Sequence, residues 1–153
     1  MLESIFSTIF ASKELTFMLN AALSIFAGLV IGLERESKGK DAGISTHTLV
    51  IMGSMLFTFI SEQIEPDHAS RIAAQVVMGI GFLGGGLILK EGTAVRNLTT
   101  AASLWFSAAI GMAFGFGFYI IGIFSTLVTI LVLHIPHICV PGKEGEKQTC
   151  ILH

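Results

Sequence analysis

Apolar residues fill five long stretches of the 153-residue chain, and charged residues are confined to the segments between them. No Asp, Glu, Lys or Arg occurs within Leu15–Leu33, Thr48–Ser61, Ile72–Leu89, Leu98–Phe116 or Phe118–Ile135. A helix needs about 17–25 mostly apolar residues to cross a bilayer. Four stretches reach that length, and the second reaches it if it extends to Gly43 or Ile64. The pattern predicts an all-α membrane protein with five transmembrane helices over residues 14–135.

The first residues carry a different pattern. Apolar residues recur at helical spacing, and polar residues fill the other face; the apolar positions are Leu2, Ile5, Phe6, Ile9 and Phe10. This arrangement is typical of an amphipathic helix that lies on a membrane surface. We therefore expect a separate interfacial helix over residues 1–13.

Composition agrees with a membrane protein and limits its function. Charged residues make up 13% of the chain and apolar ones 52%, whereas soluble domains carry roughly 25% charged residues. The net charge of −2 gives no basic field for nucleic acid. The tail over residues 136–153 is shorter than the roughly 50 residues that an independent domain needs. We expect no soluble catalytic domain, no enzymatic activity and no cofactor.

The distribution of Lys and Arg predicts the orientation in the membrane. With five spans, one side carries seven of these residues and the other carries only Lys13 and Arg71. The seven are Arg35, Lys38, Lys40, Lys90, Arg96, Lys143 and Lys147. Because cytoplasmic loops collect Lys and Arg, we expect the N-terminus outside and the tail in the cytoplasm.

Small residues indicate where the helices pack closely, since lipid gives no hydrophobic drive for helix association. They predict that spans one, three and four form the tight centre, with span three either packed or broken at its glycines. The packing or hinge positions are Gly28, Gly32, Gly79, Gly81, Gly84, Gly85, Gly86, Gly111 and Gly115. A weak repeat of helix hairpins, spans one–two and three–four, is also possible. Its matches pair Leu29, Gly32, Leu33 and Thr46 with Leu83, Gly86, Leu87 and Thr100.

Polar residues near the spans leave several interpretations open. Glu34 and Arg35 either snorkel to the interface or form an ion pair inside the bundle. The amides of Asn20 and Gln75 either join helices or contact a ligand. Asn97 either caps span four or faces an anion.

Metal binding has little support in the sequence. His134, His137 and Cys139 have ligand-like spacing, but Pro136 breaks the helix between the two histidines. No carboxylate lies within a span to hold a magnesium ion. Gly79-Ile80-Gly81-Phe82-Leu83-Gly84 fits a dinucleotide pattern, yet it lies inside an apolar span, so we expect no metal or nucleotide site there.

The order of motifs from about residue 27 to residue 110 resembles the MgtC/SapB family of bacterial inner-membrane proteins. The resemblance rests on the stretch from Asp67 to Gly86, on Lys90-Glu-Gly with Val95 to Trp105, and on Gly28 to Glu36. The matching polar and aromatic residues, which are the candidate functional positions, are Glu34, Arg35, Arg71, Gln75, Arg96, Thr99, Thr100 and Trp105. Two positions depart from the family pattern, because Ser45 replaces an Arg and Asn97 replaces a Gly.

The resemblance implies a five-span inner-membrane domain linked to survival in low magnesium and often to virulence. It implies a regulatory protein that acts on other membrane proteins; the alternative is a small transporter or channel for Mg²⁺ or another ion. Expected partners are the bilayer, a second copy in a homodimer and another membrane protein. We expect this chain to be a short member that lacks the soluble domain of longer family members.

Overall fold

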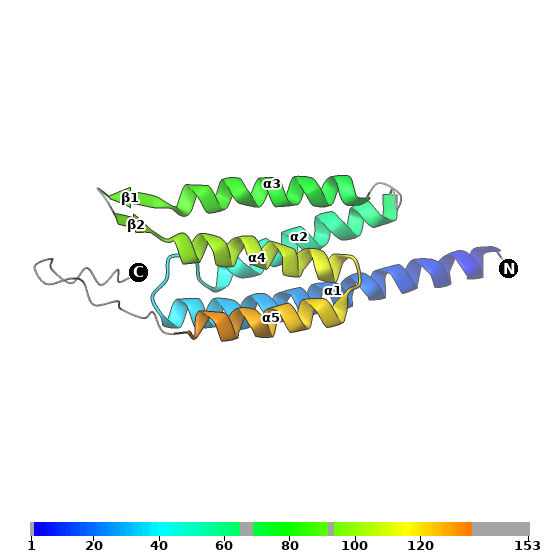
Figure 1. Cartoon of the computed structure of the whole chain (residues 1–153). Helices are drawn as coiled ribbons and strands as arrows, with labels where there is room; N and C mark the ends of the chain where they lie inside the picture. The colour runs from blue at the N-terminus through cyan, green and yellow to red at the C-terminus, as the bar shows by residue number, and fades with distance from the viewer. Residues whose placement is uncertain (1, 65–68, 92–93, 136–153) are drawn as a thin grey trace, which may run out of the picture.

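The computed structural model describes residues 2–64, 69–91 and 94–135, which form five helices and a short hairpin (Figure 1). The elements are α1 (Leu2–Ser37), α2 (Ile44–Ile64), α3 (Ala69–Leu87), β1 (Leu89–Glu91), β2 (Ala94–Arg96), α4 (Leu98–Gly115) and α5 (Tyr119–Leu133). Segments of α1 to α4 are long and apolar enough to cross a membrane, and α5 is apolar but has only 15 residues. The prediction of an all-α membrane protein is confirmed.

Helix α1 runs without a break from Leu2 to Ser37. No Gly or Pro occurs before Gly28, so nothing in the sequence stops the helix near residue 13. The structure therefore has one helix where we expected an interfacial helix followed by a span. Its 36 residues correspond to about 54 Å, and its N-terminal turns project beyond the other helices (Figure 1).

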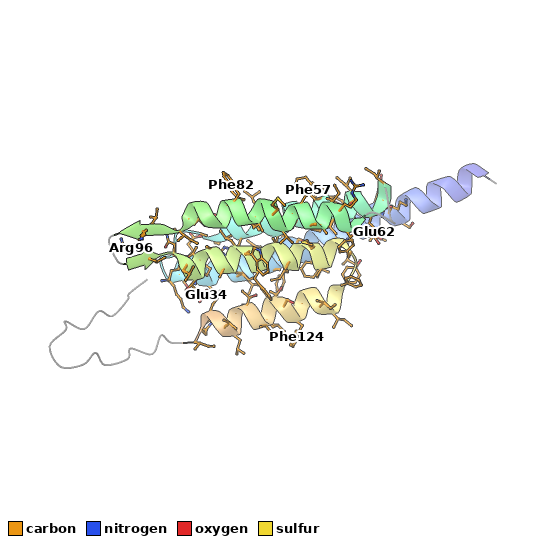
Figure 2. The ribbon with its side chains drawn as sticks, turned by 45° about the horizontal axis from the view of Figure 1, so that its top comes forward. Glu34, Phe57, Glu62, Phe82, Arg96 and Phe124 are labelled. Carbon is orange, nitrogen blue, oxygen red and sulfur yellow. The ribbon has the colours of Figure 1, made fainter. Side chains whose placement is uncertain are left out.

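The interior of the bundle is rich in small polar side chains, whereas the outside is apolar. Buried polar residues are Asn20, Ser24, Arg35, His47, Ser54, Thr58, Ser61, Thr100, Ser103, Ser107, Thr126 and Thr129. By contrast, Phe82 is 84% exposed, and Phe57 and Phe124 also lie on the outer surface (Figure 2). This distribution suits helices that are solvated by lipid and held together by close packing.

Helix α2 lies at the centre, between glycines of α1 and α4. A Cβ at Gly28 would lie 2.5 Å from Thr48 Cα, and a Cβ at Gly32 would collide with Ile44. On the other side, a Cβ at Gly111 would collide with the Ile51 carbonyl, and one at Gly115 would lie 2.7 Å from Met55 O. These four glycines therefore pack two helix backbones against α2.

Helix α3 is not part of this centre, which corrects the prediction that spans one, three and four form it. A Cβ at Gly79, Gly81, Gly85 or Gly86 would meet nothing within 4 Å, and only Gly84 approaches another helix, 3.6 Å from Ala101 O. The helix also continues through the three consecutive glycines to Leu87. Small residues alone did not reveal which face of α3 meets a neighbour.

A two-stranded hairpin joins α3 to α4, where the sequence indicated only a basic loop. Leu89 pairs with Arg96 and Lys90 with Val95 in antiparallel register. The hairpin lies at the end of the bundle where α1 ends (Figure 1), and we call this the hairpin end. The proposed repeat finds no support at its matched positions, since Gly32 is enclosed and Gly86 is open, and Thr46 is exposed whereas Thr100 is buried.

Candidate functional site

A group of charged side chains gathers where α1 ends. Successive residues on a helix point about 100° apart, so Glu34, Arg35 and Glu36 face three different directions. Each of them, directly or through Lys38, reaches another helix. We call Glu34, Arg35, Glu36, Lys38 and Asp41 the charged cluster.

Arg35 points into the bundle and is 2% exposed. One terminal nitrogen donates a hydrogen bond to Thr100 Oγ1 of α4 at 3.0 Å. The Nε atom is buried and has no hydrogen-bond partner among the described residues. Of the two interpretations open from the sequence, Arg35 follows the internal one, although its contact is a hydroxyl rather than the carboxylate of Glu34.

Glu34 and Lys38 connect α1 to α5. Lys38 Nζ forms an ion pair with Glu34 Oε1, whose side chain is 8% exposed. The same ammonium group donates to the Leu133 carbonyl at 2.7 Å. A lysine at the C-terminal end of a helix satisfies a free carbonyl and interacts favourably with the helix dipole, so this contact fixes the end of α5.

Glu36 and Asp41 bind the starts of α2 and α4. The Ile44 N–H donates to Glu36 Oε2 at 3.2 Å. The first turn of α2 has no acidic residue of its own, so Glu36 of α1 supplies the negative charge at its N-terminus. Asp41 accepts a hydrogen bond from the Asn97 side-chain amide. Asn97 occupies the N-cap position of α4, but its side chain makes no capping hydrogen bond.

The backbone conformation of Asn97 explains why Gly or Asn suits this position. Its φ of 63° lies in the left-handed region, which Gly adopts freely and Asn tolerates better than most residues. The family resemblance implied Gly here. The replacement keeps the turn and adds the contact with Asp41.

His47 extends the network into the interior, and sequence reasoning missed it. The ring is fully buried; its Nδ1 lies 3.0 Å from the Gly43 carbonyl, and its Nε2 lies 3.3 Å from Ser103 Oγ. A carbonyl only accepts, so Nδ1 carries a proton. Ser103 Oγ donates its single proton to the Thr100 carbonyl at 2.8 Å, so it does not also donate to Nε2. No motif or spacing in the sequence linked His47 to Ser103.

Three of the other candidate residues, Arg71, Gln75 and Trp105, lie apart from the charged cluster. Arg71 and Gln75 are exposed on α3, and Trp105 is 49% exposed on α4. Thr99 is exposed beside the buried Thr100, and Arg96 ends β2 at the hairpin end (Figure 2). The structure thus brings together Glu34, Arg35 and Thr100, and it places Gln75 elsewhere.

Gln75 lines an apolar groove of about 770 Å³ between α2 and α3. Apolar side chains and two glycines dominate its lining, with a few hydroxyl groups from α2. The lining residues are Ser45, Thr46, Leu49, Val50, Gly53, Ser54, Phe57, Ile72, Gln75, Val76, Gly79, Ile80 and Leu83.

No metal-binding group forms within residues 2–64, 69–91 and 94–135, where no three His, Cys, Asp or Glu side chains come together. His134 Nδ1 lies 2.8 Å from the Ile130 carbonyl of its own helix. His137 and Cys139, the other members of the possible metal set, fall outside these residues.

Comparison with known proteins identifies the family. The MgtC family matches residues 21–138. The chain is 45% identical over 130 residues to "Putative magnesium transporter YhiD" of Escherichia coli K12, covering 79% of this chain and 60% of YhiD. It is 43% identical over 112 residues to "Protein MgtC" of Salmonella typhimurium LT2, covering 73% of this chain and 48% of MgtC. The chain thus spans about half to three fifths of these relatives. No solved structure matches it. The extent of the match and the level of identity show that the chain belongs to the MgtC family.

Proposed function

We propose that this chain is a non-enzymatic regulatory protein that binds other membrane proteins when magnesium is scarce. The link to magnesium rests on family membership and on the printed name of YhiD. In line with the Lys and Arg count, the proposal places the chain in a bacterial inner membrane with its N-terminus outside.

The groove between α2 and α3 carries the proposal. It is lined by apolar side chains of both helices over much of their length. Its Gly53 and Gly79 have no neighbour within 4 Å of an added Cβ, so the groove floor has room for another side chain. Helix α3 is also the least enclosed of the four long spans. A long apolar groove with small residues and one amide, Gln75, suits a transmembrane helix of a partner protein.

The contacts of the charged cluster are those of a group that holds helix ends together, and they favour a structural role over an ion pathway. Glu34 forms an ion pair with the neighbouring Lys38, Glu36 accepts from the N-terminus of α2, and Asp41 accepts from an amide at the start of α4. Such contacts hold the ends of α2, α4 and α5 in place. A polar cavity bounded by Glu34, Arg35, Gln75 and Thr100 would favour transport, but Gln75 lines the α2–α3 groove while Arg35 binds Thr100 on α4.

One observation favours the alternative of a small transporter. The amide of Asn20 and the hydroxyls of Ser24 and Ser107 are buried, with no hydrogen-bond partner among the described residues. Buried polar atoms of this kind usually bind water or another group. Flux of Mg²⁺ into proteoliposomes holding the purified protein would distinguish the two functions. We expect no flux above empty liposomes; flux that Arg35→Ala abolishes in a folded protein would support transport instead.

Site-specific photo-crosslinking tests the regulatory function directly. A photoreactive residue at Phe57, in the groove, is compared with one at Phe124 on α5; the two side chains are 60% and 66% exposed (Figure 2). In cells grown in low magnesium, we expect a discrete crosslinked protein from position 57 and none from position 124. Equal products, or none from either position, would contradict binding in the groove.

A groove-filling substitution provides the second test. Gly79→Leu adds bulk in the groove, whereas Gly85→Leu adds the same bulk to a position of α3 that is open but does not line the groove. We expect only the first change to remove the crosslink from position 57. Loss of the product in both variants would point to a general defect of α3.

A further inference from the structure

We propose that two copies of this chain pair in the membrane through α3, with the Gln75 side chain of one copy hydrogen-bonded to Gln75 of the other. The pairing involves no other protein, so it goes beyond the regulatory function. Its contact surface is a row of outward-facing positions that we call the α3 seam: Ile72, Gln75, Gly79, Phe82 and Gly86.

The α3 seam has the spacing of a contact between two helices. Its positions follow one another by three, four, three and four residues, which is the heptad pattern of helices that pack side by side. All five positions are exposed, and Phe82 is 84% exposed and points away from the bundle (Figure 2). Helix α3 meets its own bundle through the opposite face, where Ala73, Ile80 and Gly84 are buried. The seam is therefore open to a second helix.

Gln75 is the observation that points to another protein chain rather than to lipid. Its side chain is exposed within the apolar segment Ser70–Leu87, and it forms no hydrogen bond with any described residue. Lipid tails offer neither donors nor acceptors, so an amide at this depth is costly until a protein group binds it. An amide carries both a donor and an acceptor, and two amides satisfy each other.

The composition of the seam favours a second copy as the occupant. Copies that share one orientation in the membrane are related by a twofold axis along its normal, so their α3 helices run parallel and each seam residue meets its own counterpart. One polar residue in an apolar seam fixes the register of such a pair, and Gln75 is the only polar side chain of this seam. No charged residue lies between Ile72 and Leu89, so no like charges face each other across the axis.

The glycines of the seam let the two backbones approach. A Cβ added at Gly79 or Gly86 would meet nothing within 4 Å in the single chain. These positions lie one turn before and one turn after Phe82, so each ring has space beside the glycines of the opposite helix. Close backbone approach at small residues is a main source of helix association in lipid.

Pairing also controls access to the α2–α3 groove, and this step rests on the proposed function. Ile72, Gln75 and Gly79 belong both to the seam and to the groove lining. A second copy on the seam covers the outer side of the groove, so pairing and binding of a partner helix exclude each other. The paired chain is thus the form in which the groove is closed.

Disulfide scanning of the purified full chain tests the seam in vesicles of phosphatidylethanolamine and phosphatidylglycerol. Cys139 and Cys150 are changed to serine, and single cysteines are then introduced into α3. A residue on the twofold axis can form a disulfide with its own counterpart, because this bond needs two Cα atoms within about 7 Å. The seam variants are Phe82→Cys and Gly86→Cys, and the matched controls are the adjacent open positions off the seam, Gly81→Cys and Gly85→Cys.

We expect disulfide-linked dimers from positions 82 and 86 and little from positions 81 and 85. In the Phe82→Cys chain, Gln75→Leu should weaken dimer formation about three- to thirtyfold, because it removes the amide pair. Gln75→Asn keeps an amide and should lose less. Equal dimer yields at the four positions, higher yields at the controls, no dimer at all, or a yield that Gln75→Leu leaves unchanged would overturn the proposal.

This assay is independent of the test of the proposed function. The vesicles hold no other protein, so a lack of disulfides would leave the expected crosslink from Phe57 in cells unaffected. Conversely, dimers that form through the seam when Phe57 captures no other protein would support the pairing and contradict the regulatory function.

Discussion

At the level of single residues, polar side chains at the end of α1 point in different directions and contact α2, α4 and α5. The sequence singled out Glu34 and Arg35 because they belong to a charged cluster at the end of an apolar span and match the family motif. It did not show that Arg35 would bind Thr100, since 65 residues separate them. Nor did it reveal His47, because a lone histidine at the start of a span has no distinguishing pattern. Long-range partners depend on the crossing of α1, α2 and α4, and spacing within one helix does not define that crossing.

Thr100→Val tests the contribution of the Arg35–Thr100 hydrogen bond. Valine has a similar shape but accepts no hydrogen bond, so it leaves the buried guanidinium without its partner. We expect a loss of about 1–3 kcal/mol in the free energy of unfolding. Denaturant unfolding in detergent measures it, and Thr99→Val, at the exposed neighbouring position, is the control. Equal effects at both positions would show that the hydrogen bond does not stabilise the fold.

Asn20→Leu asks whether the buried amide has a partner. Asn20 is 1% exposed, and neither of its amide atoms has a hydrogen-bond partner among the described residues. An unsatisfied amide is costly to bury, so a leucine of similar size should leave the melting temperature unchanged or raise it. A clear decrease in thermal melting would mean that a water or ligand binds Asn20 in the native protein.

At the level of elements, glycine positions decide which helices touch. The sequence correctly predicted close packing at Gly28, Gly32, Gly111 and Gly115. It also predicted packing at four glycines of α3 where an added Cβ would have no neighbour within 4 Å. Both groups have similar spacing, so composition alone could not separate them. The difference arises because α2 uses two faces, one against α1 and one against α4, and α3 packs at the side of this layer.

Alanine at the two kinds of glycine should have opposite effects. Gly111→Ala places a methyl group against the Ile51 carbonyl, and we expect a loss of about 1–3 kcal/mol in unfolding free energy through overpacking. Gly85→Ala meets open space and should gain up to about 1 kcal/mol from helix propensity. Thermal unfolding of both variants in the same detergent measures the contrast. A destabilising Gly85→Ala would indicate that α3 packs against another chain.

At the level of the whole molecule, the apolar stretches were sufficient to predict the helices, and the charges between them predicted an orientation. The stretches work as a signal because a helix in lipid must satisfy its own backbone and present apolar side chains. The hairpin at residues 89–96 escaped prediction, since its short strands carry no period that differs from a loop. The amphipathic pattern at residues 2–10 identified a helix but not its continuity with α1.

The orientation yields a prediction about accessibility from the two sides of the membrane. Ser37 and Gln63 are exposed at opposite ends of the bundle, where α1 and α2 finish. With Cys139 and Cys150 changed to serine, Ser37→Cys and Gln63→Cys place one thiol at each end. Because positive charge is retained on the cytoplasmic side, an impermeant maleimide should label intact spheroplasts at position 63 only. Position 37, beside Arg35, Lys38 and Lys40, should react only after the membrane is opened. The reverse pattern would place the charged cluster outside and invert the topology, and labelling of both positions in intact spheroplasts would show that the chain inserts in two orientations.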